Sequence, residues 1–246
     1  MKKIIALLGV ITKTSIFKIF TVLMVMAVAQ IAVVYCEILR CKKENILDDY
    51  LFSHYMNLDA HLWIFLVAFL LINLVLFWCY SAKKETNTLY FYKRIQITRN
   101  KKCLINMFYA IFCYILLFVW QVVVSRMIEL FVRSMTVQEG ASIYHYLNGT
   151  YYVDTINGIY DFNNKMVLVI NLLFIVLFAI EVAKVECIKK VPIGFIILYS
   201  LYSVTYIAKI DSRIVCIALL VILSVWSLIN LIGIVVRGYY TEEDME

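Results

Sequence analysis

Six long runs of apolar residues set what this chain can fold into. Each run has about 17 to 23 residues, and a helix rising about 1.5 Å per residue needs about 20 apolar residues to cross a hydrocarbon core of about 30 Å. Of all residues, 64% are hydrophobic and 16% are charged, unlike soluble domains. The sequence therefore predicts an all-α integral membrane protein, a single domain over residues 1–246 with six transmembrane helices. The predicted spans are about 19–35, 62–80, 104–124, 166–183, 192–208 and 214–236.

Lys and Arg residues are distributed unevenly among the segments that connect these runs. If the N-terminus is cytoplasmic, the inner segments carry 15 of them and the longer outer segments carry 8. Because cytoplasmic connections of membrane proteins are enriched in Lys and Arg, we expect both termini to face the cytoplasm and the chain to be a multi-pass protein of the plasma membrane, in contact with the lipid bilayer. The same bias accounts for the formal net charge of +6 and gives no reason to expect nucleic-acid binding.

The first 18 residues combine a basic start with a short apolar stretch, as a signal peptide does. No small-residue cleavage site follows, and Lys13 and Lys18 interrupt the apolar stretch. We therefore favour a short N-terminal helix that lies in the cytoplasmic interface of the membrane and enters the first span at an angle.

Residues suited to chemistry are sparse inside the predicted spans. The polar residues there include Gln30, Asn73, Asn106, Asn171 and Asn230. Lys, Arg and Asp are absent from the span interiors and Glu181 lies near a span end, so we expect no ion or proton pathway. The sequence contains no Gly-rich phosphate loop followed by Lys, no HExxH and no GxSxG. It therefore predicts no catalytic residue, metal site or cofactor in this chain.

A basic segment, 83–103, connects the second and third spans and holds seven Lys and Arg residues. A role in membrane topology alone would explain these charges. It would not explain the four consecutive large side chains of Leu89, Tyr90, Phe91 and Tyr92, because a solvated loop seldom contains such a run. The pattern favours a short interfacial helix on the cytoplasmic side.

This segment resembles one in the permease subunits of ABC-2-type ATP-binding-cassette exporters. In that family an acidic residue and a Gly-Thr pair follow the second span, and Pro-x-Ser-Arg leads into the third. The matching residues here are Glu85, Thr88, Leu89, Thr98 and Arg99, with Asn87 in place of the glycine and Gln96 in place of the proline. The family also has six spans, cytoplasmic termini and an amphipathic N-terminal helix. This chain departs from it in the short connection between the fifth and sixth spans, where the family usually has a re-entrant helix pair.

The resemblance implies that residues 83–99 form a coupling helix seated in a groove of a separate cytoplasmic ABC ATPase subunit. The residues implied in this coupling are Glu85, Thr88, Leu89, Tyr90, Phe91, Tyr92, Arg94 and Arg99. ATP and magnesium would bind to that partner, and a second permease, identical or related, would complete the transporter. Spans with Asn, Ser and aromatic residues but no fixed charge favour hydrophobic or amphipathic cargo, such as a peptide, an antimicrobial or a lipid-like molecule.

The extracellular insertion between the third and fourth spans, 125–165, is the second unusual region. Its first residues have helical spacing, so the third helix either continues beyond the bilayer or bends onto its surface. The remainder is rich in tyrosine, namely Tyr144, Tyr146, Tyr151, Tyr152 and Tyr160. These tyrosines form either a contact surface for a ligand or partner or a compact cap of strands and turns. The alternative function is therefore a non-transporting immunity or sensor subunit that binds a partner through this loop.

Overall fold

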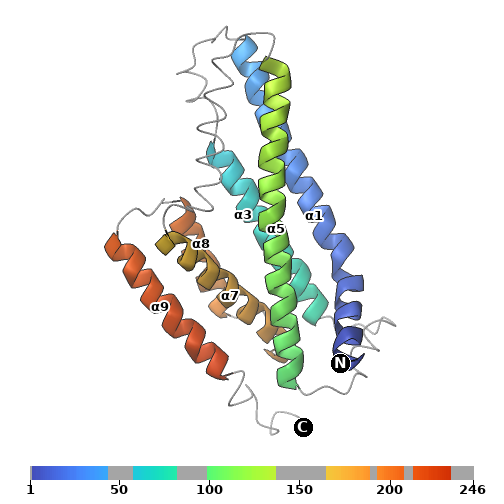
Figure 1. Ribbon diagram of the computed structural model, residues 1–246, viewed down its shortest axis with the longest axis vertical. Coiled ribbons are helices and arrows are strands. Elements are labelled where there is room, and N and C mark those ends of the chain that lie inside the picture. The colour runs from blue at the N-terminus through green and yellow to red at the C-terminus, as the bar shows by residue number, and fades with distance from the viewer. Residues whose placement is uncertain are drawn as a thin grey trace.

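The computed structural model describes residues 2–43, 58–81, 99–136, 165–188, 193–207 and 213–233, and all of them are helical. The helices are α1 (Lys2–Lys43), α3 (Leu58–Ser81), α5 (Arg99–Thr136), α7 (Lys165–Ile188), α8 (Ile193–Ile207) and α9 (Arg213–Ile232). Each coincides with one predicted span, which confirms the all-α expectation for the described part of the chain. Figure 1 shows α1 beginning and α9 ending at the same end of the bundle. We call this the basal end; α3 ends there and α5 begins there.

Four stretches of helix are long and apolar enough to cross a membrane. Within the described residues they are Ile5–Arg40, Ala60–Tyr80, Lys101–Ile128 and Ile214–Ile232. Large apolar side chains are exposed on the outer faces of these helices, as at Phe17, Trp78 and Ile214, whereas Asn73 and Gln30 are fully buried. Apolar surface of this extent is suited to lipid rather than to water. The arrangement fits a multi-pass membrane protein.

α8 is too short for the same conclusion. It has 15 residues and rises about 22 Å, less than the roughly 30 Å of a hydrocarbon core. It packs against α3 and α7, and residues on its other side, such as Ile193, Ile196 and Val204, are exposed. The fifth predicted span is therefore a helix with one apolar face left outside the bundle.

α1 is one uninterrupted helix of 42 residues, so the expectation of a separate N-terminal helix is wrong. One buried face continues from its first turns into the predicted span. The residues on this face are Leu7, Ile11, Ser15 and Ile19. The hydroxyl groups of Ser15 and Tyr109 of α5 are 2.6 Å apart. Because this packing spans the position where a bend was expected, the helix continues through it.

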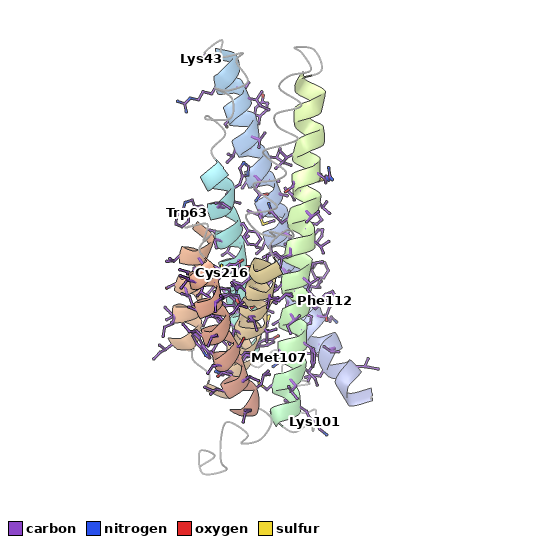
Figure 2. All side chains as sticks on the ribbon, turned by 60° about the vertical axis from the view of Figure 1, so that its left-hand side comes forward. Lys43, Trp63, Lys101, Met107, Phe112 and Cys216 are labelled. Atoms are coloured by element: carbon purple, nitrogen blue, oxygen red, sulfur yellow. The ribbon has the colours of Figure 1, made fainter. Side chains whose placement is uncertain are left out.

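α5 is also one helix, and it runs to Thr136, so the third predicted helix continues past its span without bending. α1 likewise continues to Lys43. Figure 1 shows the two helices projecting together beyond the others at the end opposite the basal end, and Figure 2 places Lys43 there and Lys101 at the basal end. In this projecting half, Nε2 of Gln30 donates to Oε1 of Gln121 at 3.1 Å, which joins the two helices.

α7 is the helix around which the bundle is organised, since it packs against α3, α5, α8 and α9. The ring of Phe178 lies 4.8 Å from that of Phe69 of α3 and 5.7 Å from that of Tyr202 of α8. Phe69 in turn stacks on Tyr114 of α5 at 5.2 Å. Offset and edge-to-face ring pairs are favourable beyond the area that they bury. These rings close the centre of the bundle.

Hydrogen bonds between side chains and neighbouring helices add to this packing. The Tyr114 hydroxyl donates to Oδ1 of Asn73 at 2.6 Å, and the Trp120 indole donates to the Leu23 carbonyl at 2.9 Å. Lipid tails are as apolar as the side chains, so helix association in a bilayer depends on close packing and on such bonds. The polar residues inside the predicted spans therefore fix how the helices meet.

The Tyr114→Phe substitution tests this role. It removes the hydroxyl that donates to Asn73 without changing the ring, so we expect the free energy of unfolding to fall by about 0.6 kcal/mol and by at most about 1.7 kcal/mol. Chemical unfolding in mild detergent micelles, followed by circular dichroism, measures the change. The control is Phe112→Leu on the exposed face of the same helix, which we expect to change stability by less than about 0.5 kcal/mol. Equal stability of wild type and Tyr114→Phe would contradict the assignment.

Candidate functional site

Two side chains of opposite charge lie together inside the bundle. Glu181 and Lys184 stand one turn apart on α7 and are 2% and 9% exposed. Nζ of Lys184 donates to Oε1 of Glu181 at 2.7 Å. Lys and Glu are almost never buried this deeply unless they are paired, and an ionisable group inside a membrane bundle marks a candidate functional site.

α9 supplies a third member of the site. Nζ of Lys184 also donates to Oδ1 of Asn230 at 2.5 Å, and Nδ2 of Asn230 donates to the Trp226 carbonyl at 2.9 Å. The second bond orients the amide so that its oxygen faces Lys184. Asn230 reaches this place because it ends the one buried face of α9, which consists of Cys216, Leu219, Leu223, Ser227 and Asn230. We call Glu181, Lys184 and Asn230 the basal cluster.

The N-terminus of α8 approaches the basal cluster from another side. Gly194 is the second residue of α8, and a Cβ placed on it would lie 2.9 Å from Oε2 and 3.0 Å from Cδ of Glu181. The N–H groups in the first turn of a helix give that end a partial positive charge. The Glu181 carboxylate therefore lies between the Lys184 ammonium and the positive end of α8. A glycine at this position permits the close approach.

The basal cluster lies close to the junction of α3 and α8. The ring of Phe195, next to Gly194, is 4.7 Å from the ring of Phe77, near the end of α3. The Tyr80 hydroxyl, one turn further along α3, donates to the Asn106 carbonyl of α5 at 3.2 Å. The cluster is thus connected by packed side chains to the helix ends that flank the segment 82–98.

The chemistry of the basal cluster is that of a polar joint between helices. Nζ of Lys184 occupies one carboxylate oxygen of Glu181, and no group of three or more His, Cys, Asp or Glu residues in the described helices could hold a metal ion. A buried ion pair gives little stability over apolar residues of similar volume, because both charges lose their hydration. It instead joins α7, α8 and α9 through contacts that water could replace.

The basal cluster was not expected from the sequence. The sequence places Glu181 near the end of a predicted span and Lys184 in the connecting segment that follows it. In the structure α7 continues to Ile188, so that both residues lie in one helix, and both are buried. The available signal was the spacing of Glu181 and Lys184, since residues three apart meet on one face of a helix. Because the predicted end of the span falls between Glu181 and Lys184, this spacing was not considered.

Most of the predicted site residues lie outside the described part of the chain. These are Glu85, Thr88, Leu89, Tyr90, Phe91, Tyr92 and Arg94 in the coupling segment, and Tyr144, Tyr146, Tyr151, Tyr152 and Tyr160 in the outer segment. Arg99 is the first residue of α5. No family model, curated protein or solved structure matches this chain.

The Lys184→Met substitution tests the pairing within the basal cluster. It leaves the Glu181 carboxylate buried without its cation, so we expect the free energy of unfolding to fall by about 3 to 5 kcal/mol. The double variant Glu181→Gln with Lys184→Met removes both charges and should recover most of this loss. Lys101→Met, a similar change at an exposed lysine, is the control and should alter stability by less than about 0.5 kcal/mol. A double variant as unstable as the single one would contradict a paired site.

Gly9 and Gly194 provide a second, matched test. Gly194→Ala places a methyl group against the Glu181 carboxylate, and overpacking of this kind costs roughly 1 to 3 kcal/mol. Gly9→Ala, with nothing within 4 Å of the added Cβ, should raise the stability of α1 by about 0.5 to 1 kcal/mol. Parallel unfolding curves of the two variants measure the difference. Changes of the same sign at both positions would show that Gly194 has no special contact.

Proposed function

We propose that this protein is the membrane-spanning permease subunit of an ATP-driven exporter of the ABC-2 type. One observation carries the proposal. α3 ends at Ser81 and α5 begins at Arg99, the last residue of the motif, and both of these helix ends lie at the end of the bundle where α1 begins and α9 ends (Figure 1). A cytoplasmic location of this end would put the motif, the basic N-terminal residues and both termini on the side where an ATPase binds.

In this proposal the coupling residues dock in a groove of a separate ATPase subunit, which supplies ATP and magnesium binding. Phe91 and its aromatic neighbours would provide buried anchors, and the charges of Glu85, Arg94 and Arg99 would set the orientation. Closure of two ATPase subunits around ATP would move the coupling segments, and the permease pair would alternate between inward-open and outward-open states.

The contacts at the basal end support this transmission of movement. The end of α3 is bonded to α5 through Tyr80 and packed on α8 through Phe77 and Phe195. α8 and α9 in turn meet α7 at the basal cluster. A displacement of the segment between α3 and α5 would therefore reach the central helix through rigid side-chain contacts rather than through a loop.

The exposed apolar faces favour a hydrophobic or amphipathic cargo and a second permease, identical or related. Exposed side chains such as Ile217, Val221 and Leu228 cover the outer face of α9, and no charged residue lies between Ile214 and Ile232. Cargo such as a peptide, an antimicrobial or a lipid-like molecule could pass along surfaces of this kind.

The projecting ends of α1 and α5 favour one second candidate, an immunity or sensor subunit that binds a partner on the outer side. α5 continues as a helix to Thr136, at the projecting end, and the tyrosine-rich residues follow it in the sequence. Affinity purification from native membranes separates the two functions. A permease brings down an ABC ATPase chain, whereas a binding subunit does not.

The coupling assignment is tested by Glu85→Lys combined with Phe91→Ala. We expect the double variant to fold and insert normally but to lose the stimulation of ATP hydrolysis in the complex, because an orienting charge and a buried anchor are both removed. The measurement is ATPase activity of the purified complex in proteoliposomes. Leu39→Ala with Lys43→Glu makes the same kind of change at the opposite end of the bundle and should leave the activity unchanged. Normal stimulation in the Glu85 and Phe91 variant would remove the assignment.

A further inference from the structure

We propose that the basal half of α9 is a gate, which opens from α7 by breaking the hydrogen bond between Lys184 and Asn230 while the Glu181–Lys184 pair stays intact on α7. Its role in transport rests on the proposed function. The opening itself is a property of this chain alone and can be tested without an ATPase. Three features of the structure lead to it.

The first feature is the change of character along the buried face of α9. In the half near Arg213 this face presents Leu219 and Leu223, whereas in the basal half it presents Ser227 and Asn230. Apolar contacts gain nothing from water, but polar contacts can exchange their bonds for bonds with water at little net cost. Where water can enter at the basal end, the basal half of α9 is therefore the part that can separate, while the close packing of Leu219 and Leu223 holds the other half in place.

The second feature is the arrangement of partners around Lys184. Its ammonium has a partner on its own helix, Glu181 at 2.7 Å, and one on α9, Asn230 at 2.5 Å. Movement of α9 removes the second partner but leaves the ion pair, so no charge is stranded in the membrane. The Asn230 amide keeps its bond to Trp226 within α9. Both sides of the junction therefore stay partly satisfied when it opens.

The third feature is the difference between α8 and α9. The N-terminus of α8 lies against the Glu181 carboxylate at Gly194, and α8 also joins the central aromatic packing through Tyr202. α9 packs on α7 and shows exposed apolar residues such as Val225 and Ile229 on its other face. α8 is thus held by charge and by aromatic packing on both α3 and α7, whereas α9 makes its extended contacts within the described helices with α7 alone. α9 can therefore move away by opening one interface, and α8 cannot.

Burial of an ion pair at this junction also narrows the free-energy gap between its closed and open forms. In the closed form both charges have lost hydration, and an apolar pair of similar volume would be as stable or more stable. In the open form water reaches the charges and restores part of that hydration. A charged junction therefore opens more readily than an apolar one of the same shape.

Thiol labelling of the full-length protein in nanodiscs tests the gate. Ser227→Cys adds a thiol to the basal half of the buried face of α9, and the native Cys216 serves as the matched control on the same face of the same helix. Only a hydrated thiolate reacts with a charged, membrane-impermeant maleimide. Peptide mass spectrometry then gives the rate of labelling at each cysteine separately, whatever the reactivity of the others.

We expect Cys at position 227 to react at least tenfold faster than Cys216. Adding Glu181→Gln and Lys184→Met to the same variant should lower the rate at position 227 severalfold, because an apolar junction gains no hydration on opening. Equal labelling rates at positions 227 and 216 would overturn the gate. An unchanged labelling rate at position 227 after removal of both charges would overturn the dependence of the gate on the ion pair. Fast labelling at 227 together with a failed ATPase test would leave the gate standing and remove only the exporter assignment.

Discussion

The contact between the Lys184 ammonium and the Glu181 carboxylate governs the C-terminal half of the bundle. An unpaired charge is costly in so apolar a setting, and here the two charges share one face of α7. The carboxylate also meets the start of α8, and the ammonium also donates to Asn230 of α9. The packing of three helices is therefore tied to one pair of opposite charges.

The N-terminal half is organised differently. α1, α3 and α5 are joined by neutral bonds such as those of Ser15 with Tyr109 and Gln30 with Gln121, and α1 and α5 extend well beyond the other helices (Figure 1). Neutral amide and hydroxyl groups cost less to bury than charges do. This half is accordingly suited to a rigid frame, whereas the half that contains α8 and α9 holds the junction suited to movement.

The helices themselves could be predicted from the sequence, because apolar runs of about 20 residues have few other ways to satisfy their backbone in lipid. The continuity of α1 could not be predicted from hydropathy, since Lys13 and Lys18 interrupt the apolar run while the buried face continues past them. The basal cluster was missed for a related reason. A hydropathy profile divides a chain into inside and outside, and it does not show that a lysine beyond a predicted boundary turns back to a carboxylate on the same helix. Contacts between helices, such as that of Asn230 with Lys184, depend on how the helices pack and have no local signal in the chain.

The shortness of α8 affects the surrounding lipid. The 15 described residues of α8 rise about 22 Å, less than a hydrocarbon core of about 30 Å. In a bilayer, acyl chains beside its exposed isoleucine side chains would therefore compress, or headgroups would sink toward the centre. Either adjustment brings the polar boundary of the membrane nearer to the start of α8, where Gly194 meets Glu181. Membrane thickness is thereby linked to how easily solvent reaches the charges, and longer acyl chains would favour the dry, closed state of the bundle.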